Sequence, residues 1–139
     1  MIIFLILAFL TLPAHAQEFY VYKPVKITDG DTIKLDVSKE SPLIKKLGLS
    51  VRIKGIDTPE KAPRAKCKKE SELGQQATKF TTDLVGNKEL ILSQVENDHY
   101  GGRIVANVKV GGVDIAKALL HRELAVPYTG EGPKHNWCK

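Results

Sequence analysis

The chain has 139 residues, which fits one domain that can bury its own hydrophobic core. Its 21 Lys and Arg against 16 Asp and Glu give a net charge of +5, which indicates either a polyanionic partner (nucleic acid, anionic lipid or a cell-wall polymer) or simply good solubility. The four histidines are scattered and no CxxC pair occurs, which argues against a zinc site. The sequence contains no internal repeat and no low-complexity segment.

Residues 1–16 have the features of a secretory signal peptide. They include no Lys, Arg, Asp or Glu, an apolar run covers residues 2–12, and Ala14-His15-Ala16 has the small-x-small form of a cleavage site. The apolar run is too short to span a bilayer as a helix, which takes about 20 residues. We expect cleavage after Ala16, a secreted or periplasmic location, and a mature domain at residues 17–139. A buried N-terminal strand and an uncleaved anchor are the alternatives.

The two cysteines are Cys67 and Cys138. In an oxidising compartment, two cysteines most simply form one disulfide. That bond would tie the C-terminal tail to the middle of the chain. Two free thiols, or pairing between chains, are the alternatives.

The first part of the mature chain predicts strands. Residues 19–27 and 32–37 are predicted strands, and the Asp-Gly-Asp turn at 29–31 joins them into a hairpin. Residues 49–56 form a third predicted strand. It ends at Thr58-Pro59, because proline cannot donate a ladder hydrogen bond and restricts the residue before it.

Two loops and a helix are predicted around and after the third strand. Residues 38–48 are predicted to be a polar loop, and residues 61–69 a basic loop. Residues 72–85 are predicted to be a helix that ends at Gly86-Asn87. Its expected apolar stripe consists of Leu73, Ala77, Phe80 and Leu84.

The last part of the chain adds strands and a second helix. Strands are predicted at 89–95 and 103–110, a hairpin turn at Gly111-Gly112, a helix at 115–124 and a short strand at 124–126. These elements do not alternate as βαβ units. They predict an α+β or mainly β fold, namely a five-stranded barrel of the oligonucleotide/oligosaccharide-binding (OB) type with two attached α-helices.

Charged side chains gather where the third strand ends. Arg52, Asp57 and Glu60 flank that point, and a cation beside two carboxylates could hold a metal ion and a phosphate together. Taken singly, these residues have ordinary explanations: acidic residues in a turn usually stabilise the turn, and an arginine often pairs with a carboxylate on the surface. The chemistry therefore depends on the fold bringing separate stretches to one place.

Three motifs occur in a recognisable order. They are the acidic turn Asp29-Gly30-Asp31-Thr32, the segment from Arg52 to Asp57-Thr58-Pro59-Glu60, and the stretch Asp98-x-Tyr100-Gly101 followed by Arg103-x-x-Ala106. In order and spacing they resemble the staphylococcal nuclease family, and the resemblance covers nearly all of residues 19–128. It implies an OB barrel that uses calcium to hydrolyse phosphodiester bonds of DNA and RNA with little sequence preference.

The resemblance also assigns roles to individual residues. Asp31, Asp57 and the backbone carbonyl of Thr58 would bind Ca²⁺, and Asp29 would lie close by. Arg52 and Arg103 would bind the scissile phosphate, and Glu60 would act on the attacking water. Tyr100 would line the nucleotide pocket, as would Tyr128. The resemblance implies a monomer without a stable protein partner, and without membrane attachment once the signal peptide is removed.

The chain departs from the family pattern at two positions. An extra glycine, Gly102, separates the Tyr-Gly pair from Arg103, and Glu123 stands where the family usually has a glycine after the last helix. A left-handed Glu at that position would cost about 1 kcal/mol. Two other functions compete with the nuclease: a non-catalytic OB module that binds nucleic acid, and a secreted module that binds an anionic polymer. The complete acidic set argues against both.

Overall fold

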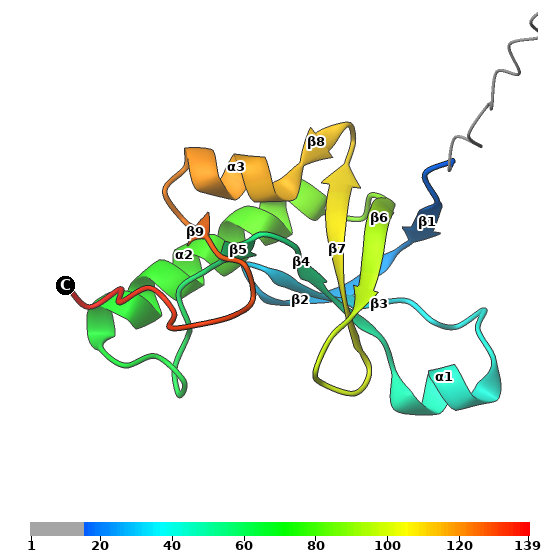
Figure 1. Cartoon of the computed structure of the whole chain (residues 1–139), viewed down its shortest axis with the longest axis horizontal. Helices are drawn as coiled ribbons and strands as arrows, with labels where there is room; N and C mark the ends of the chain where they lie inside the picture. Colours follow the sequence, from blue (N-terminus) through cyan, green and yellow to red (C-terminus); the bar gives the residue numbers. More distant parts are fainter. Residues whose placement is uncertain (1–15) are drawn as a thin grey trace, which may run out of the picture.

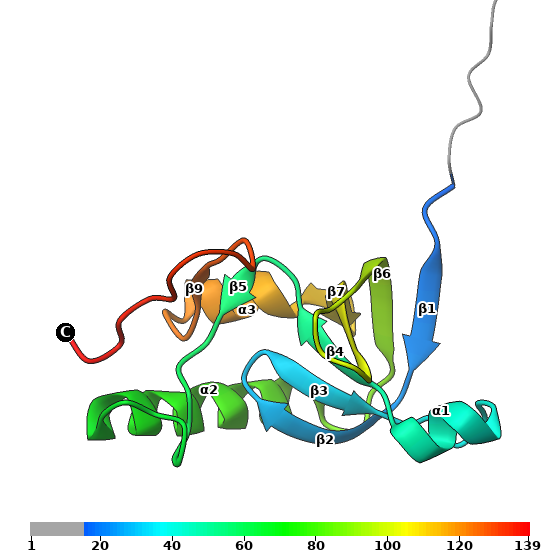
Figure 2. The same ribbon diagram turned by 60° about the horizontal axis from the view of Figure 1, so that its bottom comes forward.

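In a computed structural model that describes residues 16–139, a strongly curved sheet is flanked by three helices (Figures 1 and 2). The strands are β1 (Phe19–Tyr22), β2 (Pro24–Asp29), β3 (Thr32–Leu35), β4 (Ser50–Ile53), β5 (Ile56–Asp57), β6 (Leu90–Asn97), β7 (Arg103–Val110), β8 (Val113–Asp114) and β9 (Val126–Pro127). The helices are α1 (Pro42–Leu47), α2 (Lys68–Val85) and α3 (Ile115–His121).

The order of the main sheet explains its curvature. Neighbouring strands run β1-β6-β7-β4-β3-β2, and β8 pairs with β7. Only Lys23 separates β1 from β2, so the two ends of this order belong to one stretch of chain. The sheet must therefore curl back on itself, as an OB barrel does. The predicted fold class is confirmed.

The core lies inside this curved sheet. Val51 and Ile53 of β4 pair with Ile104 and Ala106 of β7, and the alternation of buried and less buried residues along both strands matches the pleat. Along β7, Ala106, Val108 and Val110 face this core, and the strand predicted at residues 103–110 is confirmed. The fully or nearly fully buried apolar side chains are Ile33, Leu35, Val51, Ile53, Ile56, Ala77, Val85, Leu90, Leu92, Ala106, Val108, Val110, Ile115 and Leu119.

The buried face of helix α2 overlaps the predicted one at Ala77 but is shifted around the helix. Its buried line runs through Gly74, Ala77, Thr81 and Val85, whereas Leu73, Phe80 and Leu84 are only half-buried. The expected stripe was therefore rotated, because the small residues are the ones that let the helix approach neighbouring backbone closely. The helix also begins earlier than predicted, with Cys67 as its N-cap.

Several predicted bounds were wrong. The 38–48 segment includes helix α1, whose start has the capping serine Ser41 followed by a proline, and whose last turn is followed by Gly48. Within residues 16–139 there are thus three helices instead of two, and the main sheet has seven strands instead of five. The first predicted strand is divided at Lys23 into β1 and β2. The first part pairs with β6, and the second part pairs with β3.

The remaining predictions concern the disulfide, Glu123 and the N-terminal segment. Cys67 and Cys138 form a disulfide, as predicted. Glu123 has φ 57°, so it does adopt the left-handed conformation. No helix within residues 16–139 is long and apolar enough to cross a membrane. The expected signal peptide falls almost entirely on residues 1–15, which lie outside the described residues.

Candidate active site

The parallel pairing of β4 with β7 brings the two predicted arginines to one face. Ser50 pairs with Arg103, and Arg52 pairs with Val105. Paired residues of neighbouring strands point to the same side, as do residues two apart on one strand. Arg52 and Arg103 therefore project together from the outer face, opposite the core residues Val51 and Ile53.

The acidic turn is fixed against helix α2. Thr81 Oγ1 donates a hydrogen bond to the Gly30 carbonyl at 2.7 Å, and a Cβ on Gly30 would lie 2.7 Å from that of Ala77, so only glycine allows this approach. Asp31, which is 7% exposed, accepts hydrogen bonds from Thr32 Oγ1 at 2.9 Å and from the Thr58 N–H at 3.3 Å. The hydrogen bond from Thr58 joins two of the predicted motifs directly.

Asp57 is almost completely buried, with 2% exposure. Its Oδ1 lies 3.4 Å from Arg52 Nη2 and 3.3 Å from Lys134 Nζ. Arg52 Nη2 is also 3.9 Å from Asp31 Oδ2, so the guanidinium lies between the two carboxylates. Burial raises the pKa of the Asp57 carboxyl, and the charges of Lys134 and Arg52 offset part of that rise.

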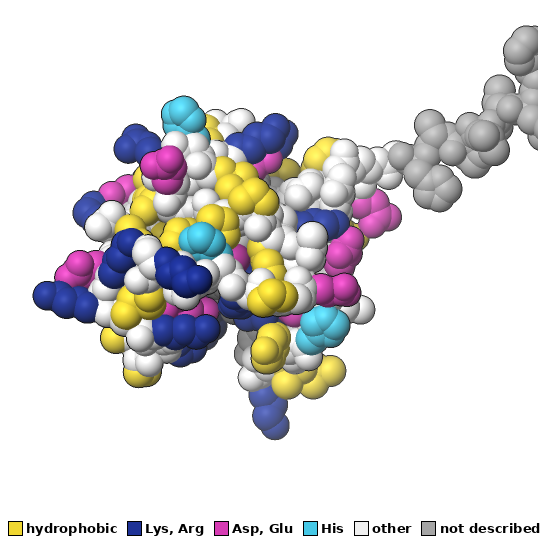
Figure 3. Space-filling model, turned by 60° about the vertical axis from the view of Figure 1, so that its left-hand side comes forward, with side chains coloured by type: hydrophobic (Ala, Val, Ile, Leu, Met, Phe, Trp, Pro, Cys, Tyr) yellow, Lys and Arg dark blue, Asp and Glu magenta, His cyan; other side chains and the backbone are white. Residues whose placement is uncertain are grey.

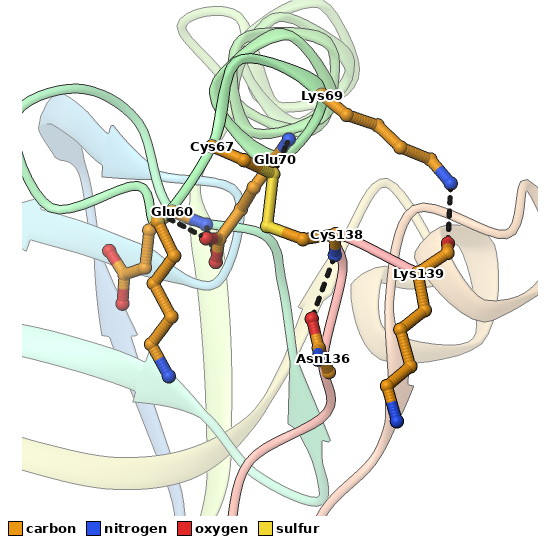
Figure 4. Close-up of a disulfide and its surroundings, with 8 residues drawn as sticks. Glu60, Cys67, Lys69, Glu70, Asn136, Cys138 and Lys139 are labelled. Atoms are coloured by element: carbon orange, nitrogen blue, oxygen red, sulfur yellow. Dashed lines mark hydrogen bonds between the residues drawn. A yellow bond between two sulfur atoms is a disulfide. The ribbon is translucent and has the colours of Figure 1, made fainter.

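Glu60 is held by the first turns of α2. Its backbone N–H donates to Glu70 Oε1 at 3.4 Å, and Glu70 Oε2 accepts from the Lys66 N–H at 2.6 Å (Figure 4). A Cβ on Gly74 would lie 2.5 Å from the Glu60 carbonyl oxygen, so the helix touches the backbone of the site there. The Glu60 carboxylate pairs with Arg64 Nε at 3.0 Å and with Lys134 Nζ at 3.6 Å.

Arg103 reaches the site despite the extra glycine. Gly102 has φ +72°, which glycine adopts at little cost, and its carbonyl accepts a hydrogen bond from the Ser50 N–H at 2.8 Å. Arg103 Nε pairs with Asp98, and its guanidinium lies 4.4 Å from the centre of the Tyr100 ring. Although burial raises the pKa of Asp98, hydrogen bonds from Arg103 and from the His99 N–H outweigh burial and keep it low.

Tyr128 reaches the site from the start of the C-terminal tail. Its ring centre is 5.6 Å from the Arg52 guanidinium carbon. Its backbone N–H donates to the Gly55 carbonyl at 2.9 Å, and its hydroxyl donates to the Gly132 carbonyl at 2.9 Å. Tyr128 is thus held at its backbone and at its hydroxyl group. Tyr100, in contrast, is 67% exposed.

These side chains surround one cavity of about 520 Å³. The cavity is lined by Thr28, Asp29, Asp31, Thr32, Arg52, Glu60, Arg64, Asp98, His99, Tyr100, Arg103, Tyr128, Gly130 and Lys134. Lysines and arginines are prominent on the face of the molecule that Figure 3 shows. Asp57 and Thr58 do not line the cavity but are buried behind it. The structure therefore brings all the predicted site residues to one place, in the cavity wall or directly beneath it.

The sequence reasoning missed two cations. Arg64 Nη2 contacts Asp29 Oδ2 at 2.7 Å and bridges it to Glu60. Its position four residues after Glu60, in the basic loop, was a signal that could have been used. Lys134 comes from the irregular tail, and no motif in the sequence points to it. Burial, the largest influence, lowers the pKa of Lys134, but Asp57 and Glu60 outweigh it and raise the pKa.

Within residues 16–139, no group of three or more His, Cys, Asp or Glu side chains is placed to hold a metal ion by itself. Two buried carboxylates, Asp31 and Asp57, flank Arg52, and Asp29 Oδ1 is buried without a hydrogen-bond partner. Calcium accepts carboxylate, carbonyl and water oxygens in a flexible shell. The donor set is therefore compatible with a calcium ion that takes its remaining ligands from backbone and water.

The fold and the cavity together define an OB-fold protein with an arginine-lined cavity beside buried carboxylates. Residues 50–137 match the family described as staphylococcal nuclease homologue, and the chain belongs to that family. A protein of Haemophilus influenzae described as an uncharacterized endonuclease is 34% identical over 96 residues. That alignment covers 69% of this chain and 46% of the relative, so the chain spans about half the length of that protein.

Proposed function

We propose that this protein is a calcium-dependent nuclease that hydrolyses phosphodiester bonds of DNA and RNA with little sequence preference. The observation that carries the proposal is the convergence of Arg52, Arg103 and Glu60 on one cavity, with Asp31 and Asp57 beside Arg52. Membership of the staphylococcal nuclease family supports it, as does the description of the Haemophilus relative as an endonuclease.

In the proposed reaction the arginines bind the phosphate. A guanidinium stays charged and can contact two phosphate oxygens at once, so Arg52 and Arg103 would offset the charge that grows on the non-bridging oxygens. Asp98 fixes Arg103 from behind through its Nε, which leaves the terminal nitrogens of that guanidinium for the substrate. Their shared face between β4 and β7 would hold the phosphate in a fixed orientation.

Glu60 is the proposed group that orients or deprotonates the attacking water. It lines the cavity with Arg52 and Arg103, and its backbone is fixed by Glu70 and Gly74. Asp31, Asp57 and the Thr58 carbonyl would hold the calcium ion. When bound, that ion would act as a Lewis acid and neutralise phosphate charge. Tyr100 and Tyr128 would stack on bases, which suits any sequence because every base has a π face.

The compartment is a separate part of the proposal. We propose that residues 1–16 are removed as a signal peptide and that residues 17–139 act as a secreted or periplasmic domain. The Cys67–Cys138 disulfide supports an oxidising compartment. The mass of the protein isolated from the medium or periplasm tests this, since retention of the first 16 residues would contradict it.

Digestion of plasmid DNA and of RNA by the purified 17–139 domain tests the activity. We expect degradation with Ca²⁺, none with a chelator, and a loss of roughly 100-fold or more in kcat for Glu60→Gln. Glu96→Gln is the matched control, because Glu96 pairs with Lys54 on the surface and does not line the cavity.

Each alternative result has a defined meaning. A folded Glu60→Gln variant with full activity would contradict the role of Glu60. A folded wild-type domain that binds nucleic acid without cutting it under any divalent metal would favour the non-catalytic OB module. Activity restored only by another metal would contradict the calcium assignment.

A further inference from the structure

The C-terminal tail crosses the cavity between two anchors. At one end, β9 pairs with β5, with Val126 opposite Asp57. At the other end, Cys138 is bonded to Cys67 at the start of α2 (Figure 4). Trp137 next to it is 9% exposed. The segment between Tyr128 and Trp137 has no regular secondary structure, and its residues 129–136 are exposed. Its path is therefore set by what holds its two ends.

Lys134 is the tail side chain that enters the site. Its Nζ lies 3.3 Å from Asp57 Oδ1 and 3.6 Å from Glu60 Oε1, and the side chain is 48% exposed. It lines the cavity together with Arg52 and Arg103. Because half of the Lys134 side chain stays exposed while it pairs with the buried Asp57 carboxylate, its ammonium group can also meet a ligand in the cavity.

The cations of the cavity differ in how tightly they are held. Arg64 makes short contacts of 2.7 Å with Asp29 through Nη2 and 3.0 Å with Glu60 through Nε, so two of its three nitrogens are paired. The contacts of Lys134 (3.3 and 3.6 Å) and of Arg52 (3.4 and 3.9 Å) are longer. Longer contacts cost less to exchange for a phosphate, and an ammonium group has three donors. Lys134 is thus held no more tightly than Arg52, and Arg103 keeps its terminal nitrogens free because Asp98 contacts only its Nε.

We infer that Lys134 is a third phosphate-binding cation of this site, and that the Cys67–Cys138 disulfide presents it by holding the tail across the cavity. This inference rests on the proposed action on nucleic acid. It makes substrate affinity depend on the oxidised state of a bond that lies outside the cavity. Reduction would free the tail beyond β9 and move the lysine away from Asp57 and Glu60.

Binding in a chelator tests the inference without cleavage. The probe is a fluorescein-labelled single-stranded octanucleotide, and its anisotropy is measured over a series of salt concentrations in EDTA. We expect Lys134→Met to raise Kd about tenfold and to reduce the salt slope by about 0.7, the value for one phosphate contact on a single strand. Lys134→Arg should bind like the wild type. Lys139→Met is the matched control, because it removes the same charge beyond Cys138.

Reduction of the disulfide supplies the second arm. Dithiothreitol should weaken binding by the wild type to the level of Lys134→Met and leave Lys134→Met itself unchanged. The Cys67→Ser, Cys138→Ser variant should behave like the reduced wild type. Thermal unfolding in both redox states identifies a temperature at which every form is folded. In a cleavage assay with Ca²⁺, the same variants should raise KM and keep kcat within about threefold of the wild-type value.

Several results would overturn the inference. Lys134→Met could bind as tightly as the wild type, or Lys139→Met could weaken binding equally. Reduction could weaken Lys134→Met as much as the wild type, which would separate the disulfide from Lys134. A wild type that fails to bind the oligonucleotide would also contradict it. A wild type that binds but does not cut would refute the proposed nuclease while leaving the inference on Lys134 intact.

Discussion

The end of the central sheet and the C-terminal tail both supply charged groups to the cavity, but they hold them in opposite ways. Asp31, Arg52 and Asp57 come from paired or tightly turned backbone and are largely buried. Lys134 comes from an irregular segment and is half exposed. In the proposed function, the sheet thus places the groups that need a fixed geometry, and the tail supplies a group that reaches the ligand. The difference suggests that changes at the sheet end affect turnover and changes in the loops and tail affect affinity.

The largest effect should follow a change at Arg52. Arg52→Lys keeps the positive charge between Asp31 and Asp57 but loses the planar fork that contacts two oxygens at once. We expect kcat to fall roughly 100- to 1,000-fold, with a stability near that of the wild type. Steady-state cleavage of a fluorogenic oligonucleotide measures the first, and thermal unfolding the second. A fall in affinity without a fall in kcat would mean that Arg52 acts on binding, as proposed for Lys134. It would contradict the distinction between the sheet end and the tail.

The next effect concerns the contact between α2 and the Glu60 backbone. Alanine normally improves a helix interior by about 1 kcal/mol over glycine, but a Cβ at Gly74 would lie 2.5 Å from the Glu60 carbonyl oxygen. We expect Gly74→Ala to destabilise the fold by about 1–3 kcal/mol and to lower kcat. Gly101→Ala is the control, since nothing lies within 4 Å of a Cβ there. Denaturant unfolding checks both, and equal stabilities would mean that α2 can move away from Glu60 freely.

A smaller effect should appear in the pH dependence of stability. Burial raises the pKa of Asp57 above its ordinary 3.8, so the native state binds this proton more tightly than the unfolded chain does. The stabilising effect of the protonated group is full below 3.8 and is lost as the pH rises through the raised native value. We therefore expect Asp57→Asn, in EDTA, to raise Tm at pH 7, with a gain that shrinks towards pH 4. Glu96→Gln should leave Tm nearly unchanged at both pH values.

The smallest effect should come from the loop that carries Tyr100. This ring is 67% exposed and touches Arg103 on one face only, which leaves the other for a base. Loss of one stacked base is worth about 1–3 kcal/mol of binding, so Tyr100→Ala should raise KM by roughly tenfold with little change in kcat or stability. Tyr100→Phe should behave like the wild type. A fall in kcat instead would show that Tyr100 helps to orient Arg103.

Much of this protein was predictable from its sequence because the information is local. The strand predicted at residues 49–56 includes Val51 and Ile53, which are buried in the structure, and Arg52 between them lies on the opposite face. The motifs around Asp31, Asp57 and Arg103 indicated the fold class, which the structure confirmed. Helix α1 was also encoded locally, by Ser41 and the proline after it, and that signal was overlooked.

The tertiary structure decided what depends on contacts between distant segments. The parallel register of β4 and β7 brings Arg52 beside Arg103, and nothing in either strand specifies its partner. Gly74 lies on the buried line of α2 because the helix must approach Glu60, whereas hydrophobicity alone favoured Leu73. Lys134 gives no signal in the sequence, because it occupies an irregular segment without periodicity. Its place beside Asp57 and Glu60 follows from where β9 and the disulfide fix the two ends of the tail.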